Sequence, residues 1–339
     1  TNTCSLMTYG FDPKLSRFSP WLGAQYSVVE SLARLSALGA DPFTARLTNQ
    51  EYFERLGKDP EKWGYPLEAL LGLVNAQMEF ETPAIGGKDS MSGTFNELHV
   101  PPTLITFAVT TAKTDAIVCG EFKQAGSNIY LVEHNPLANY EPNYAQIKEN
   151  FKNVLAQNKA GNILSARLVK DSGVGAATAI MAFGNEIGAQ ITIEKPYAYR
   201  LGSLIVETQN EVDLPNWTKI GTTLETPELH INDEHVSLDE AYAAWTSRYD
   251  DLYPRLVEGS KETLDTPLFE GEKRFSKVKV EKPVVVIPVF PGQNCELDTA
   301  TKFRRAGAEV HVVVFNNLDV DHIRQSIETL AQEIEKAQI

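Results

Sequence analysis

The chain has 339 residues, of which 42% are apolar, and it carries a formal net charge of −14. This length is enough for two or three domains that each bury a core of their own. The acidic surplus argues against nonspecific binding to nucleic acid or to anionic membranes, because phosphate groups are held chiefly by Lys and Arg. No stretch approaches the roughly 20 apolar residues of a membrane-spanning helix, so we expect neither nucleic acid nor membrane as a partner.

The cysteines and the first residues indicate the compartment. Cys4, Cys119 and Cys295 are odd in number, lie far apart and form no CxxC pair. A disulfide framework or a zinc site is therefore disfavoured, and a cytoplasmic location is expected. The start, TNTCSLMTYG, does not begin with Met and has no basic segment before an apolar run, so no signal peptide is indicated. We expect a processed product or a piece of a longer protein.

Residues 1–123 are predicted to form a first subdomain, part of an α/β fold. Apolar residues at helical spacing fill 27–38, and a second helix is expected over 66–80 with Pro66 in its first turn. A polar loop with two glycines follows, and then the β-branched run 103–112 suits a buried strand. The turn-prone sequence KQAGS marks the end of this subdomain.

Residues 124–208 are predicted to form a second subdomain. A strand begins at Asn128, a helix covers NYAQIKENFKNVLAQN, and residues 163–188 indicate a strand, a glycine turn and a helix. The segments AQITIE and GSLIVET are further expected strands. Residues 209–282 are predicted to be an extension and linker, with one helix over 238–253 and a charged linker after it.

Residues 283–339 have the pattern of an α/β unit. An apolar strand, an amphipathic helix and a second apolar strand over 283–315 predict a βαβ unit with parallel strands. A final helix is expected over 319–338. Two strand–helix pairs are too few for a doubly wound domain, so we interpret this segment as the truncated start of one.

The loop over residues 86–92, within TPAIGGKDSMSGTF, is the first candidate site. It is not a Walker A loop, because Asp89 stands where that pattern needs Ser or Thr. Gly86 and Gly87 permit close backbone approach, Lys88 can neutralise a phosphate, and Asp89 can hold Mg²⁺. A tight hairpin with a polar tip is the alternative interpretation.

Other motifs give weaker signals. KDSGVGAATA, residues 170–179, is a glycine turn before a helix start, which suits either a bound anion or tight packing of strand on helix. Cys295 precedes a predicted helix, but no spacing gives it a His partner, so we favour a non-catalytic cysteine. The six His have neither HxH nor HExxH spacing, which disfavours a metal site made of His.

Three of these stretches resemble one family, phosphoribosylformylglycinamidine synthase. PAIGGKDSMSGTF resembles a loop in its second synthetase-like half, and FPGQNCELDTATKFRRAGAEV resembles the start of its glutaminase domain. IMAFGNEIG resembles a helix that precedes the last strands of each half. The resemblance implies α+β subdomains like those of aminoimidazole ribonucleotide synthetase, followed by the start of a flavodoxin-like class I glutaminase domain.

The resemblance implies a C–N ligase of purine biosynthesis. The family converts formylglycinamide ribonucleotide, glutamine and ATP into formylglycinamidine ribonucleotide, glutamate, ADP and phosphate. ATP and Mg²⁺ are the implied cofactors, since a cation must offset the phosphate charge. The glutaminase nucleophile and its partners are expected in later segments, so this chain holds no expected catalytic residue and is expected to be inactive alone. The expected protein partner is the missing first half of the enzyme or a second copy of this chain.

The resemblance implies nucleotide or substrate contacts at six residues: Gly86, Gly87, Lys88, Asp89, Ser90 and Asn49. Gly87 matches a position where the backbone approaches nucleotide, and Ser90 matches a substrate-contacting serine. Lys88 stands where some relatives carry a metal-binding Asn, so here it is expected to pair with phosphate directly. Asn49 matches the position of a nucleotide-binding Asp in compact relatives.

The chain departs from the family's metal-binding pattern. At a DRSDGG-like turn, Leu168 replaces the first Asp, Lys170 replaces the Ser, and Asp171 falls on the second Asp. In a GExxxN helix pattern the chain has Glu30 and then Arg34. The metal ligands are therefore left open. This departure favours one alternative, a non-catalytic scaffold half that supports a partner's active site; a stand-alone kinase-like enzyme of the same superfamily is another.

Overall fold

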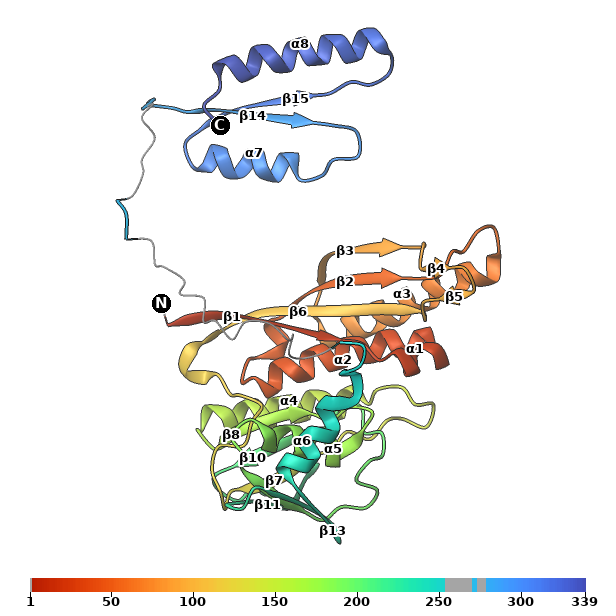
Figure 1. Cartoon of the computed structure of the whole chain (residues 1–339), viewed down its shortest axis with the longest axis vertical. Coiled ribbons are helices and arrows are strands. Elements are labelled where there is room, and N and C mark those ends of the chain that lie inside the picture. The colour runs from red at the N-terminus through yellow and green to blue at the C-terminus, as the bar shows by residue number, and fades with distance from the viewer. Residues whose placement is uncertain (1, 254–269, 273–278) are drawn as a thin grey trace. The chain divides into compact units, whose positions relative to one another are not determined.

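The computed structural model describes residues 2–253, 270–272 and 279–339. The chain divides into two compact units, Thr1–Val257 and Glu258–Ile339, which we call the first and the second unit (Figure 1). Most of the linker predicted between Pro254 and Pro283 lies outside the described residues. Among the helices that are described, none is both long and apolar enough to cross a membrane.

The first unit begins with a four-stranded sheet in the order β1-β6-β2-β3. Its strands are β1 (Thr3–Gly10), β6 (Thr103–Lys113), β2 (Arg46–Tyr52) and β3 (Ala84–Ser90). β6 pairs antiparallel with both β1 and β2, whereas β3 pairs parallel with β2 and forms an edge. A short hairpin, β4 (Thr94–Phe95) and β5 (Leu98–His99), follows β3.

Helices α1 (Pro13–Phe18), α2 (Pro20–Ala37) and α3 (Pro60–Phe80) pack on one side of this sheet (Figure 1). The helices predicted from 27 and from 66 begin earlier than expected. Each starts with a proline at its first position, after the capping residues Ser19 and Asp59. Pro66 therefore lies inside α3, one and a half turns beyond the true start.

A seven-stranded sheet follows in the order β13-β12-β9-β11-β7-β10-β8. Its strands are β7 (Asn128–Val132), β8 (Ile163–Leu168), β9 (Gly188–Ile191), β10 (Leu204–Thr208), β11 (Trp217–Leu224), β12 (Glu228–Ile231) and β13 (Glu234–Ser237). The associated helices are α4 (Tyr144–Lys159), α5 (Gly173–Phe183) and α6 (Leu238–Thr246). The residues that were predicted to begin an extension at 209 thus contribute three strands to this sheet.

The core of the first unit has two clusters on the two faces of this sheet. One cluster joins Leu32 of α2 and Phe151 of α4 to Leu204 of β10. The other packs α5, through Met181, against Ile205 of β10. Because α2 touches the first sheet, α3, α4 and β8, it is buried almost all round, which explains its lack of a polar face.

The second unit contains β14 (Val284–Val289), α7 (Glu296–Arg305), β15 (Glu309–Val314) and α8 (Val320–Lys336). β14 and β15 pair parallel in register, so the predicted βαβ unit is confirmed. Its small core includes Val285 and Ala300. The assignment of this unit to a flavodoxin-like glutaminase stays a prediction, as do the predicted domain boundaries.

Candidate functional site

The predicted loop over residues 86–92 is mostly a strand. Residues 84–90 form β3, and Asn49 of β2 is the register partner of Gly87. A Cβ on Gly87 would lie 2.6 Å from the backbone oxygen of Asn49, so only glycine lets the two strands approach this closely. At Gly86 a Cβ would meet nothing within 4 Å. The loop prediction was wrong because pairing with β2 outweighed the turn tendency of the glycines.

The six predicted site residues are divided between the two faces of the sheet. Neighbouring side chains on a strand point to opposite faces. Lys88 and Ser90 share the face that the helices leave open, and the Lys88 ammonium lies 5.9 Å from the ring centroid of Tyr52. Asn49 and Asp89 point to the helix-covered face. The structure therefore brings Asn49 beside Gly87 but does not gather all six around one point.

The helix-covered face holds polar atoms that sequence reasoning missed. Asn49 Oδ1 and Glu51 Oε1 are buried and have no hydrogen-bond partner among the described residues. Glu51 is the register partner of Asp89. Burial, and then the charge of Asp89, raise the pKa of Glu51 to about 7. The signal was present in the sequence, because Glu51 follows Asn49 at the strand period of two.

These carboxyl groups do not make a metal site. In the described part of the chain, no group of three or more His, Cys, Asp and Glu residues is placed to hold a metal ion. The prediction that Asp89 holds Mg²⁺ therefore stays a prediction without further ligands around it in the described residues.

Cys295, which precedes α7, is exposed. Both ring nitrogens of His311 contact Glu309 and Glu333 instead of a cysteine.

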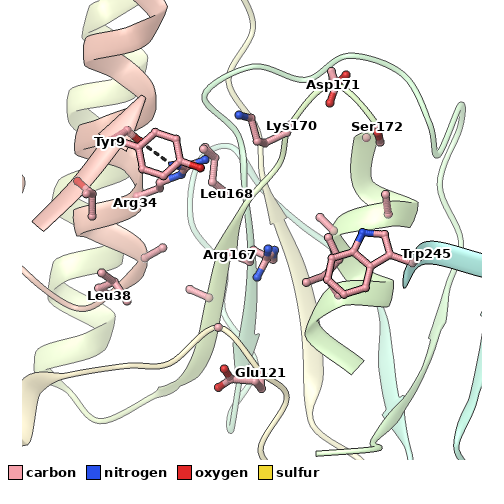
Figure 2. A pocket seen from close by; sticks show the side chains of 18 of the residues that line it. Tyr9, Arg34, Leu38, Glu121, Arg167, Leu168, Lys170, Asp171, Ser172 and Trp245 are labelled. Carbon is pink, nitrogen blue, oxygen red and sulfur yellow. Dashed lines mark hydrogen bonds between the residues drawn. The ribbon is translucent and has the colours of Figure 1, made fainter. Parts of the chain in front are cut away.

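A second candidate site is a cavity of about 600 Å³ in the first unit, lined by residues of β1, α2, β8, α5 and α6 (Figure 2). Three cationic side chains line it: Arg34, Arg167 and Lys170. Arg34 donates a hydrogen bond to the Tyr9 carbonyl at 2.7 Å and lies 4.2 Å from the centroid of its ring. The α5 helix starts at the cavity with Gly173, whose φ is +73°.

Glu30 of α2 anchors two of these cations. Its Oε1 lies 2.6 Å from the Lys170 ammonium and 3.5 Å from the Arg34 guanidinium. Its Oε2 accepts the Phe11 N–H at 2.6 Å. Both carboxylate oxygens are therefore occupied by protein donors. The Mg²⁺ that the family resemblance implies does not fit here, because Lys170 and Arg34 stand where ligands would be needed and Leu168 has no donor atom.

Arg167 differs from the other two cations. Within the described ranges its guanidinium makes no hydrogen bond and no ion pair. Burial and then repulsion from Arg34 lower its pKa, while Glu121 acts in the opposite direction. Sequence reasoning passed over this residue, although an arginine inside the largely apolar segment ILSARLV was a visible signal. An anion in the cavity would relieve this uncompensated charge.

No protein-family model matches the chain. The PurL subunit of phosphoribosylformylglycinamidine synthase from Lactobacillus delbrueckii subsp. bulgaricus is 26% identical over 207 residues, covering 56% of this chain and 27% of that protein. PurL from Lacticaseibacillus paracasei is 28% identical over 217 residues, covering 59% and 29%. The chain is a PurL-like protein. The resemblance read from its motifs is thereby confirmed, and the chain spans less than a third of the length of these relatives.

Solved structures agree on the fold. PurLQS from Thermotoga maritima matches with a TM-score of 0.55 at 15% identity, covering 70% of this chain and 44% of that one. Hydrogenase maturation protein HypE matches with a TM-score of 0.51 at 14% identity, covering 70% and 88%. The chain thus has the mixed α/β fold that was predicted, and it shares this fold with the PurLQS and HypE structures.

Proposed function

We propose that this chain is part of an ATP-dependent phosphoribosylformylglycinamidine synthase, a C–N ligase with glutamine as amido donor in cytoplasmic purine biosynthesis. The observation that carries the proposal is the match to PurL over 207 residues. Structures of Thermotoga maritima PurL, which have the same fold, were solved with ATP and with FGAR. ATP, and formylglycinamide ribonucleotide as substrate, follow from it. In this proposal a glutaminase domain uses the glutamine, and the complete ATP site of the whole enzyme binds the Mg²⁺.

The chain's own residues contribute binding at β3. Lys88 is exposed on the open sheet face and supplies positive charge to a phosphate, and Ser90 offers a hydroxyl on the same face. Gly87 keeps β3 close to β2 and so fixes the position of both side chains. A nucleotide held here would rest against an open sheet face, so a second protein surface would be needed to enclose it.

The open face of the four-stranded sheet is also the proposed partner site. Its side chains are mixed: Met7 is 70% exposed, and polar residues such as Thr48 and Gln50 of β2 lie on the same face. In Figure 1 the helices cover the other side of this sheet. The half-buried Phe107 on β6 adds an apolar side chain to the open face. The proposed occupant is a matching sheet from the first half of the enzyme, and a second copy of this chain in the absence of that half.

Calorimetric titration with ADP and Mg²⁺ tests the nucleotide contact. The folded chain should bind ADP saturably, and Lys88→Ala should weaken binding about tenfold, because one charge-assisted contact is lost. Lys152→Ala, which removes an exposed lysine on α4, serves as the matched control and should bind as the unchanged chain does. Equal binding by Lys88→Ala and the unchanged chain would exclude β3 from the site.

One observation favours a second candidate, a scaffold half that supports a partner's active site without chemistry of its own. Glu30 is held by Lys170 and Arg34 in place of a metal. Reconstitution with the partner half distinguishes the two candidates. If Lys88→Ala and Ser90→Ala both leave the rate of the reconstituted ligase unchanged, the scaffold role stands.

A further inference from the structure

The cavity beside β8 carries a cation that the described residues do not neutralise. The Arg167 side chain lines the cavity (Figure 2). The nearby Arg34 repels it, and burial adds to the cost of its charge. A partly buried charge without a partner is unfavourable and favours a ligand of opposite sign.

The acidic groups around the cavity are engaged elsewhere. Asp171 accepts a hydrogen bond from the Lys14 ammonium at 2.9 Å. Glu121 pairs with the Lys123 ammonium at 3.2 Å. Glu30 is shared by Lys170, Arg34 and the Phe11 N–H. Among the described residues, Glu121 is the acidic residue that acts on Arg167 electrostatically, and it makes no hydrogen bond to it. The cavity lining therefore holds three cationic side chains against two acidic ones, and each acidic one is paired with a lysine.

Two neighbouring features fit a phosphate-bearing ligand. The positive end of the α5 helix dipole faces the cavity, which favours an anion. Its first amide groups are partly used, since Gly173 donates to Lys170 O and Gly175 donates to Pro196 O. Side-chain charge must therefore hold the anion. Trp245 lines the same cavity, is 56% exposed and stacks on Phe183, so it offers an aromatic face beside the anion.

We propose that this cavity binds the phosphate group of a small phosphorylated ligand directly on Arg167, with Lys170 and Arg34 close by, and without Mg²⁺. The Lys170 ammonium on Glu30 supplies the charge that a metal would otherwise bring. The proposal does not depend on the ligase function, because it concerns a cavity of β8 and α5 and not the β3 residues.

Calorimetric titration with pyrophosphate, once in EDTA and once in Mg²⁺, tests the proposal on the full chain. Binding in EDTA should be at least as tight as in Mg²⁺, because Mg²⁺ competes for the free anion. Arg167→Gln should weaken it about tenfold or more, and Arg167→Lys should restore part of the loss. Arg55→Gln, which removes an exposed arginine elsewhere in the first unit, is the charge-matched control.

A second measurement needs no variant. Pyrophosphate should protect Arg167 from an arginine-specific dicarbonyl reagent, as mapped by mass spectrometry, and should change the Trp245 fluorescence, a change that Trp245→Phe removes. Binding that requires Mg²⁺ overturns the proposal. So does the absence of saturable binding, or an unchanged affinity in a folded Arg167→Gln protein.

Discussion

The two sheets of the first unit differ in how completely the chain covers them. The seven-stranded sheet packs against α2 and α4 on one face and against α5 on the other. The four-stranded sheet has helices on one face, while apolar residues such as Met7, which is 70% exposed, lie on the other. A half-covered sheet with apolar residues on its open face indicates an interaction surface. The first sheet therefore carries the surface at which we propose a partner, whereas the second sheet is packed by helices of the chain on both faces.

The largest expected effect is a difference in unfolding free energy between substitutions on the two faces of β1. Leu6 and Met7 are neighbours on β1, with exposures of 8% and 70%. Leu6→Ala should lower the free energy of unfolding by about 2–5 kcal/mol, because it leaves a cavity against α2. Met7→Ala should change it by about 0.5 kcal/mol or less. Denaturant unfolding at low protein concentration measures both, and equal losses would mean that the open face is covered within the monomer.

The sequence predicted the elements better than their roles. Periodicity located the βαβ unit and the strand over 103–112, because both follow from local apolar patterns. It misread β3, since the glycines of GGKDS indicate a turn when β2 is not considered. Register between β2 and β3 is a long-range property, so the separation of Lys88 from Asn49 on opposite faces was beyond any local signal.

The cavity was harder to predict for the same reason. Arg167, Arg34 and Tyr9 come from three elements that only the fold brings together. The sequence comparison did identify Lys170 and Arg34 as departures from a metal-binding pattern. It did not show that both contact Glu30. In the structure the two departures from the family pattern, Lys170 and Arg34, are linked because both cations contact the same carboxylate.

The next largest effect concerns Glu51, a carboxyl group buried under the covered face of the first sheet. Burial and Asp89 raise the pKa of Glu51 from 4.5 to about 7. Between these values the folded state binds more protons than the unfolded state, so stability is full below about pH 4.5 and is lost as pH rises toward 7. The loss should be about 3 kcal/mol, and Glu51→Gln should abolish it. Unfolding curves from pH 5 to 8 measure this slope; parallel curves for the two proteins would contradict the prediction.

A smaller effect of opposite sign is expected at the cavity. Arg167→Leu should raise the free energy of unfolding by about 1 kcal/mol in the absence of phosphate, because it removes a partly buried charge that Arg34 repels. Pyrophosphate should stabilise the unchanged protein and not the variant. Thermal unfolding with and without pyrophosphate measures both. A destabilised variant would mean that Arg167 supports the fold and is not held ready for a ligand.

The last prediction tests which exposed apolar surface carries self-association. The open sheet face and the outer side of α3 both expose methionines, Met7 at 70% and Met78 at 75%. If the open sheet face pairs with a second copy, Met7→Glu should weaken self-association about tenfold, because a carboxylate would be desolvated in the contact. Met78→Glu on α3 should leave it unchanged. Sedimentation velocity over a concentration series measures both constants. The reverse order would place the contact on α3 and leave the open sheet face to a different partner, whereas a monomer at every concentration would exclude self-association through either surface.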